Sequence, residues 1–423
     1  MSQPTAPLPP HQPRQDGPTP TTPYTTALAA PPPPRLLRHG GRRFGELAAV
    51  GLLSAALATG GTWGAISLAD TGPATVATAS DTASSGADVV PVSSAAKTNP
   101  DWNAVTAAVS PSVVSITVQG NGAGGEGSGV VIDTKGHVLT NHHVVSGAGD
   151  NPQITVTLAD GKTYEATIAG EDASTDLAVV TLTDPPEGLT PITVGSSAQL
   201  QVGDPVMAIG NPLGLSGTVT TGIVSALNRP VTTSSSEGQG QGQSPFGQPQ
   251  GAPVVTSAIQ TSAAVNPGNS GGALVDAAGR LVGINSSIAS LGGSGGQSGS
   301  IGIGFAIPVD EASWIAQQLI EDGSAQHAFL GVTPSDGTAT QGAASRSGAK
   351  VESVSGGSPA AEAGLREGDL IVAVDKAPVS SAESLVGLVH AHKIDTTVDL
   401  AVIRDGKELS ITATLGTAPT TTS

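Results

Sequence analysis

Between Trp102 and Pro308 the chain repeats one pattern, a short run of apolar and β-branched residues followed by a turn. Turns such as Asp160-Gly161 are of the kind that joins two strands of a hairpin. Short strands at this spacing predict antiparallel barrels or a sandwich, and a 2% aromatic content with 57 Gly and 32 Pro argues against a helical bundle. The predicted class is mainly β. The strands are predicted at residues 113–118, 129–133, 154–158, 163–168, 177–182, 206–209, 217–227, 254–260, 272–275, 281–284 and 303–307.

A helix closes this first unit, and a smaller unit follows it. Asp310 is the predicted N-cap, apolar residues recur at helical spacing after it, and Gly323 can end the helix. After Phe329 come further strands and one helix, which is predicted to begin at a capping box of Ser380 and Glu383. The second unit is therefore predicted to be a compact α+β module. Its strands are predicted at residues 350–354, 370–374, 397–403 and 409–414.

The N-terminal part contains one segment that is long enough to cross a membrane. Residues 1–43 are rich in Pro and Thr, end in several Arg, and are predicted to be a disordered cytoplasmic tail. Residues 44–69 are predicted to form a transmembrane helix, because the 23 residues 47–69 carry no charge. As a helix they would span about 35 Å, against about 30 Å of hydrocarbon. A cleaved signal peptide ending near Ala77-Thr78-Ala79 is the alternative.

The folded units are predicted to lie outside the cytoplasm in either case. The basic residues before the apolar segment favour a cytoplasmic N-terminus, so the bulk of the chain is on the other side of the membrane. Residues 70–99 are a predicted linker, the first unit is predicted at 100–323 and the second at 324–416. Residues 417–423 are predicted to be a disordered tail.

Charge and cysteine content exclude several classes of function. The formal net charge is −17, and five of the 17 basic residues precede the apolar segment, so the folded part is more acidic still. Such a surface repels phosphates, and no nucleic-acid partner is predicted. The absence of cysteine excludes disulfides, thiol catalysis and Cys-based zinc sites. No cluster of metal ligands stands out either, so neither a cofactor nor a metal is predicted.

One glycine-rich run carries a candidate nucleophile, Ser270. It reads Asn266-Pro267-Gly268-Asn269-Ser270-Gly271-Gly272, and its glycines allow a bend tight enough to aim two N–H groups, those of Gly268 and Ser270, into one pocket. Such a pocket is an oxyanion hole, which a serine nucleophile needs together with a base and a group that orients the base. Taken alone, the run has a plain loop as its alternative interpretation.

The base and its orienting carboxylate have more than one candidate. His143 stands where a strand ends and a polar turn begins, and His142 is its neighbour, so the residues alone do not choose between them. Asp176 precedes the apolar strand at 177–180, where a carboxylate can be sequestered enough to hold an imidazole tautomer. The other candidates for the carboxylate are Asp172, Asp160 and Asp150.

In combination these residues resemble a known family. The order His143, Asp176, Ser270 across an all-β segment is that of the two-barrel serine proteases. Residues 102–322 resemble the HtrA (DegP) group, and that resemblance implies a trypsin-like fold with the triad His143, Asp176 and Ser270, His142 being a tuning neighbour. The motifs that carry it are Gly127 to Asp133, Leu139 to Val145, Thr175 to Val179, Ala208 to Pro212, Gly222 to Ser225, Ile259 to Thr261, Asn266 to Gly272 and Ile301 to Pro308.

The second unit resembles a PDZ domain of the kind that follows such proteases. Residues 358–365 and 367–371 carry the resemblance, and Phe329-Leu330-Gly331-Val332 resembles its carboxylate-binding loop. The resemblance implies that backbone amides of this loop receive a peptide C-terminus while the peptide adds as a strand to the sheet edge.

Two segments depart from the family pattern. Residues 231–253 are rich in Ser, Gln and Gly where the family has a loop that senses PDZ ligands, and residues 291–300 are nearly featureless where a loop shapes the specificity pocket. Ser262 and Ala273 stand where the family often has Asp and Pro.

The predicted protein is a membrane-tethered serine endopeptidase that cleaves unfolded or damaged exported proteins in quality control and stress response. The family resemblance also implies a homo-trimer. Two other classes stay open: a peptide-capturing scaffold whose triad never aligns, and a receptor whose cytoplasmic tail is the working part.

Overall fold

The computed structural model describes residues 99–417 apart from 121–123, 147–151, 213–216, 234–253, 288–301 and 342–343. The segments predicted as tail (1–43) and transmembrane helix (44–69) lie outside the described residues, as does the predicted linker (70–99) apart from its last residue. All but the first residue of the C-terminal tail also lie outside them. Most of the segment 231–253 and the whole of 291–300 also lie outside them. No helix in the part of the chain that the structure describes is long and apolar enough to cross a membrane.

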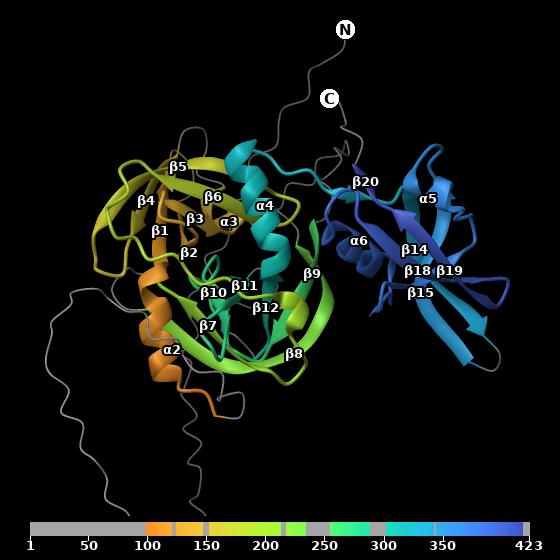
Figure 1. Cartoon of the computed structure of the whole chain (residues 1–423), viewed down its shortest axis with the longest axis horizontal. Helices are drawn as coiled ribbons and strands as arrows, with labels where there is room; N and C mark the ends of the chain where they lie inside the picture. The colour runs from red at the N-terminus through yellow and green to blue at the C-terminus, as the bar shows by residue number, and fades with distance from the viewer. Residues whose placement is uncertain are drawn as a thin grey trace, which may run out of the picture. The chain divides into compact units, whose positions relative to one another are not determined.

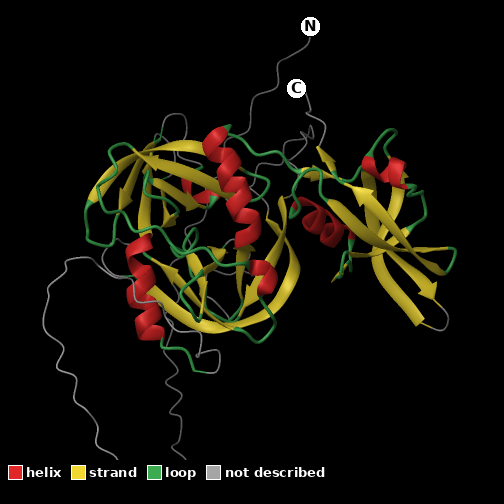
Figure 2. Ribbon diagram, in the orientation of Figure 1, coloured by secondary structure: helices red, strands yellow, loops and turns green. Residues whose placement is uncertain are grey.

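The first unit consists of two closed antiparallel barrels (Figure 1 and Figure 2), which confirms the mainly-β, two-barrel prediction. The first barrel has the order β1-β2-β3-β6-β5-β4 and the second the order β10-β11-β12-β9-β8-β7. The strands of the first are β1 (Val113–Gln119), β2 (Gly125–Val131), β3 (His137–Thr140), β4 (Gln153–Thr157), β5 (Thr163–Asp172) and β6 (Leu177–Leu182). Those of the second are β7 (Pro205–Gly210), β8 (Thr218–Thr233), β9 (Val254–Thr261), β10 (Ala273–Asp276), β11 (Leu281–Ser286) and β12 (Gly304–Pro308).

Strand β2 differs from its prediction, which began at Gly129 and ended at Asp133. The strand begins four residues earlier, at Gly125, in a run that propensity alone disfavours. Packing explains the added glycines, because a Cβ on Gly127 would lie 2.7 Å from Val144 Cγ2 and one on Gly125 would lie 2.6 Å from Val144 O. The close approach of Val144 leaves no room for a side chain at either position, so tertiary packing overrides the local preference.

Side chains alternate between the barrel interior and the outside, as the period of two requires. Val114, Ile116 and Val118 of β1 belong to the core of the first barrel, whereas Val113 faces a different apolar cluster. That cluster also contains residues from both barrels and from two helices, so it joins the barrels to each other. The helices are α2 (Trp102–Val109), α3 (His142–Val145) and α4 (Val309–Glu321) in the first unit, and only α2 and α4 contribute to the cluster.

Helix α4 was predicted with Asp310 as its N-cap, and this detail is wrong. The helix begins at Val309, directly after β12, and its N-cap is Pro308, without a side-chain cap. Asp310 lies in the first turn, where its carboxylate accepts hydrogen bonds from Ala198 N at 2.8 Å and Ser197 Oγ at 2.9 Å. Asp310 therefore fastens the helix to the connection between the two barrels.

Helix α4 also carries a buried carboxyl group, because Glu311 is only 3% exposed. Its Oε2 atom has no hydrogen-bond partner among the described residues. Burial, with a further contribution from the charge of Asp172, raises the pKa of Glu311 to about 8. The folded state therefore holds this proton at neutral pH, whereas the unfolded chain releases it above pH 4.5.

Glu311→Gln is expected to stabilise the protein more at pH 8 than at pH 5. Between pH 4.5 and about 8 only the unfolded wild type ionises this group, so wild-type stability falls as the pH rises through that window. Glutamine does not titrate in this range. The free energy of unfolding of the variant, relative to that of wild type, should therefore rise by on the order of 3 kcal/mol from pH 5 to pH 8. Urea unfolding at both pH values measures it, and a gap that does not change with pH contradicts the assignment.

The second unit is an antiparallel sheet of order β14-β15-β16-β18-β19 with two helices. Its elements are β13 (Ala328–Phe329), β14 (Val332–Gln341), β15 (Ala344–Val354), α5 (Pro359–Ala363), β16 (Leu370–Val374), β17 (Ala377–Pro378), α6 (Ala382–His390), β18 (Thr397–Arg404), β19 (Lys407–Thr414) and β20 (Gly416–Thr417). The predicted α+β class is confirmed, but the side chain that caps α6 is Ser381, which accepts from Ser384 N, and not Ser380.

An ion pair explains the aspartate of the Glu367-Gly368-Asp369 motif in this unit. Asp369 is 1% exposed, and its carboxylate accepts hydrogen bonds from Arg404 Nε at 2.6 Å and from Arg404 Nη2 at 2.7 Å. It also accepts from Arg366 N at 2.8 Å. Two parallel bonds to a guanidinium compensate the buried carboxylate, so Asp369 is structural.

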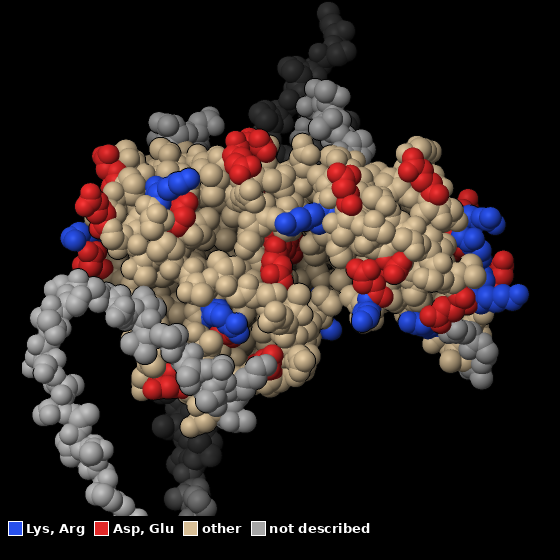
Figure 3. Space-filling model, viewed as in Figure 1, with Lys and Arg blue, Asp and Glu red and all other residues tan. Residues whose placement is uncertain are grey.

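On the face of the molecule in Figure 3, acidic side chains are distributed over the surface and basic side chains stand next to several of them. Arg280 pairs with Asp276 at 2.6 Å and Lys350 with Glu352 at 3.1 Å. In these two pairs the basic group is balanced by a neighbouring carboxylate.

Candidate active site

Asp176 stands at the end of a short turn between β5 and β6 and has a left-handed backbone, with φ of 57°. Its carbonyl oxygen accepts from His142 N at 3.1 Å and from Asn141 Nδ2 at 2.9 Å. These bonds tie the turn to α3, which carries the two candidate histidines. Asparagine and aspartate tolerate this backbone conformation better than most residues.

The sequence candidate Asp172 holds this turn together from within. Its carboxylate accepts from Ser174 N at 3.1 Å, from the hydroxyl groups of Ser174 and Thr175, and from His327 Nε2 at 3.0 Å. Burial alone would raise the pKa of Asp172, but His327 and the two hydroxyl groups outweigh burial and leave it lowered. Asp160 pairs with Lys162 in an exposed turn, and Asp150 lies outside the described residues.

The two adjacent histidines have different partners. His143 Nδ1 lies 2.9 Å from Asp176 Oδ1 and 3.0 Å from Oδ2, and its backbone N–H donates to Oδ1 at 3.1 Å. His142 Nδ1 instead lies 3.3 Å from Glu171 Oε2. Asp176 is 6% exposed, so its attraction for the His143 ring is only weakly screened by water. His143 and Asp176 therefore have the geometry of a base and the carboxylate that orients it.

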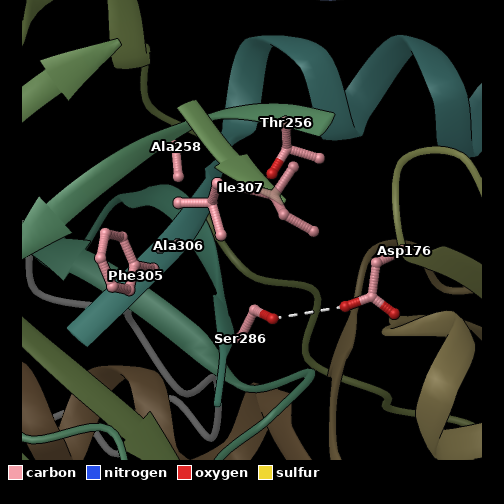
Figure 4. Close-up of a pocket in the computed structure, with 8 residues that line it drawn as sticks. Asp176, Thr256, Ala258, Ser286, Phe305, Ala306 and Ile307 are labelled. Atoms are coloured by element: carbon pink, nitrogen blue, oxygen red, sulfur yellow. Dashed lines mark hydrogen bonds between the residues drawn. The ribbon is translucent and has the colours of Figure 1, made fainter. Parts of the chain in front are cut away.

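Ser286 supports the same carboxylate, and the sequence did not point to it. Its hydroxyl donates to Asp176 Oδ2 at 3.3 Å, as the dashed line in Figure 4 shows. Asp176 and Ser286 also line a hollow with Phe305, Ala306 and Ile307, whose side chains are apolar (Figure 4). These neighbours limit the access of water to the Asp176 carboxylate.

Ser270 lies in a turn that the second barrel holds rigidly. Gly271 N donates to Asn285 O and Asn285 N to Gly272 O, both at 2.9 Å, and Ser128 N donates to Ser270 O at 2.8 Å. Gly271 has φ of 81°, and a Cβ there would lie 2.1 Å from Ser128 O. Only glycine fits this position, because both the backbone conformation and the close approach exclude a side chain.

The N–H groups of Gly268 and Ser270 have no acceptor among the described residues. Gly268 has φ of 91°, and its carbonyl oxygen accepts from Ser128 Oγ at 2.6 Å, which fixes the orientation of the following peptide unit. Two unsatisfied donors beside a serine hydroxyl can receive an oxygen that becomes negatively charged.

The hydroxyl group of Ser270 points to a residue that the sequence did not single out. Ser287 N donates to Ser270 Oγ at 3.0 Å, and the two hydroxyl groups form a second, shorter bond. Among the described residues no hydrogen bond joins Ser270 Oγ to His143. The fold thus pairs His143 with Asp176 and brings Ser270 to the same site through the neighbouring residues Ser286 and Ser287.

The predicted carboxylate-binding loop begins in β13 and ends in β14. Leu330 O accepts from Ala360 N at 2.8 Å and Gly331 O from Ser355 N at 2.9 Å, so the carbonyl groups are used within the fold. The N–H groups of Leu330 and Gly331 have no acceptor among the described residues.

An imidazole held by a buried carboxylate, a serine in a glycine turn and two open N–H donors on a double barrel define a trypsin-like serine endopeptidase. In agreement, residues 127–284 match the model of the trypsin-like peptidase domain, and residues 328–415 match that of the PDZ domain. The chain belongs to the HtrA/DegP family of serine proteases.

Two relatives and one solved structure illustrate the similarity. The serine protease PepD of Mycobacterium tuberculosis is 41% identical over 403 residues, which are 92% of this chain and 81% of PepD. The periplasmic pH-dependent serine endoprotease DegQ of Escherichia coli is 38% identical over 299 residues, 70% of this chain and 60% of DegQ. The structure of the HtrA-type protease AlgW with a tripeptide superimposes with a TM-score of 0.53 at 34% identity, covering 76% of this chain and 98% of AlgW.

Sequence reasoning missed four polar side chains that hold the site. Ser128 and Asn141 were within reach, because both stand in motifs that already pointed to the family. Ser286 and Ser287 gave no signal, since serines at the end of a strand are common and only the folded barrels place them beside Asp176 and Ser270.

Proposed function

We propose that the triad is His143, Asp176 and Ser270, and that it cleaves peptide bonds through an acyl-enzyme. The observation that carries this assignment is the contact of His143 Nδ1 with both oxygens of the buried Asp176 carboxylate. It leaves Nε2 of the ring free of partners in the described part of the chain, and Nε2 is the atom that must accept a proton.

In the proposed reaction, Ser270 Oγ attacks the carbonyl carbon of the scissile peptide bond while its proton passes to His143 Nε2. Asp176 keeps the Nδ1 proton in place and stabilises the imidazolium that forms. The carbonyl oxygen becomes an oxyanion and accepts hydrogen bonds from the N–H groups of Gly268 and Ser270. His143 then gives its proton to the leaving amine, and a water molecule, deprotonated by His143, releases the acyl group from Ser270.

A fluorophosphonate probe tests the assignment, because it reacts only with an activated serine hydroxyl. The expected result is one probe per chain on Ser270, located by mass spectrometry of tryptic peptides, with no labelling in His143→Ala. A chain that stays unlabelled while it still binds peptides would be a scaffold instead, and labelling of a different serine would move the nucleophile elsewhere.

The second unit is proposed to bind peptide C-termini at Phe329-Leu330-Gly331-Val332. The support is the pair of open N–H donors at Leu330 and Gly331, which can receive a carboxylate. Gly331 has φ of 87°, and a Cβ there would lie 2.2 Å from Ser358 Cβ, so the loop needs a glycine to turn its amides outward.

The substrates are proposed to be unfolded or damaged exported proteins, and the enzyme to act in quality control. A relative named a periplasmic endoprotease and the apolar segment 44–69 after a basic run support an extracytoplasmic protease tethered by one helix. The proposed domains are 100–323 for the protease and 324–416 for the PDZ unit, in line with α2 starting at Trp102 and β13 at Ala328. The proposed homo-trimer rests on the family resemblance.

A further inference from the structure

The hydroxyl group of Ser270 is engaged by Ser287, a residue outside the proposed triad. Ser287 offers two bonds to the same atom, one from its N–H at 3.0 Å and one between the two hydroxyl oxygens. Ser270 is 3% exposed, so no solvent competes freely for these bonds. In this state the nucleophilic oxygen is directed to Ser287.

These bonds oppose the first chemical step. Attack requires the hydroxyl proton of Ser270 to lie on a path to His143 Nε2, and a lone pair on Oγ to face the substrate carbonyl. A hydrogen bond between the two hydroxyl groups engages the Ser270 side chain with Ser287 and not with the imidazole, and the N–H of Ser287 occupies a lone pair of the attacking oxygen. Both interactions must be given up before the acyl-enzyme can form.

The contact is built into the barrel by the strand that leads to it. Asn285 O accepts a hydrogen bond from Gly271 N, and Asn285 N donates one to Gly272 O. These bonds fasten the end of β11 to the turn that carries Ser270. Successive side chains of a strand point to opposite sides. Ser286 therefore reaches Asp176, while Ser287 reaches Ser270.

We propose that Ser287 is a positioning residue that restrains the nucleophile, so that the resting enzyme reacts more slowly than its triad allows. A substrate that displaces the Ser287 hydroxyl releases Ser270 to His143. This inference rests on the proposed role of Ser270, and it assigns opposite effects to two adjacent serines: Ser286 supports the triad through Asp176, and Ser287 works against it.

The test is the second-order rate constant for fluorophosphonate labelling of the full-length protein in the absence of peptide. Ser287→Ala removes the hydroxyl but keeps the N–H, and labelling is expected to become about three- to tenfold faster, the factor that one neutral hydrogen bond is worth. Ser287→Thr restores a hydroxyl and should react like wild type. Ser286→Ala, the matched change one residue earlier, should react more slowly than wild type.

The proposal is overturned if Ser287→Ala labels at the wild-type rate or more slowly, or if Ser287→Thr is as fast as Ser287→Ala, since the gain would then come from packing. A crystal structure of Ser287→Ala gives a second readout: Ser270 Oγ should lie closer to His143 Nε2 than in wild type, and an Oγ that has not moved contradicts the proposal. If wild type and every variant remain unlabelled, the proposed function fails and not this inference alone.

Discussion

Ser270→Ala is expected to reduce the cleavage of unfolded casein by about six orders of magnitude, to the background set by binding and by the oxyanion donors alone. Alanine removes the hydroxyl oxygen that is proposed to form the acyl-enzyme. Cleavage followed by gel electrophoresis and by release of labelled peptide measures the loss.

The fold should survive this change, because Ser270 Oγ bonds only to Ser287 within the described residues. The melting temperature and the affinity for C-terminal peptides are therefore expected to stay close to wild type. Ser353→Ala is the matched control, since Ser353 is an exposed serine of β15 whose hydroxyl bonds Thr333 Oγ1 at 3.0 Å. Equal casein cleavage by Ser270→Ala and wild type would end the protease assignment for this residue.

Asp176→Asn is expected to lower kcat by about four orders of magnitude with little change in KM. The carboxylate accepts the Nδ1 proton of His143, whereas the amide group of asparagine donates to Nδ1. The imidazole would then carry its proton on Nε2, where it cannot take a proton from Ser270. Asparagine also adopts the left-handed backbone of this position, with φ of 57°, so the turn is expected to keep its shape.

The split between kcat and KM distinguishes this effect from a loss of structure. Asp160→Asn changes an exposed carboxylate in a turn of the same barrel and should leave both constants unchanged. A variant Asp176→Asn with wild-type kcat would assign the orienting role to another carboxylate, and Asp172, four residues earlier in the same turn, would be the next to test.

Most of the barrel architecture was predictable from the sequence, and the exceptions have physical causes. The strands with β-branched residues, such as β6, appeared in the pattern because their side chains fit a pleated and buried surface. Strand β2 was displaced because its glycines are selected by close packing and not by local preference. Asp310 has the chemistry of an N-cap, but β12 runs straight into the helix, and the carboxylate bonds to the distant Ser197 instead.

The candidate site shows the same division. Motif order and the family resemblance pointed to His143, Asp176 and Ser270, whereas residue types alone left His142 and Asp172 as alternatives. The geometry separates them, since His142 faces Glu171 while His143 meets Asp176, and Asp172 is taken up by Ser174, Thr175 and His327. One residue along a helix turns the side-chain direction by about 100° around the axis. The adjacent histidines therefore face different partners, and the sequence alone does not say which of them faces Asp176.

The sequence by itself determined the mainly-β class, the two folded units and the run around Ser270, because alternating burial and turn chemistry are local properties of the chain. Only the tertiary structure decided what the hydroxyl of Ser270 touches. Pairing of β10 with β11 brings Ser287 to Ser270 within the second barrel, and packing of the two barrels brings Ser286 to Asp176 of the first. Whether a serine is a nucleophile at rest depends on such contacts, and these are properties of the assembled barrels.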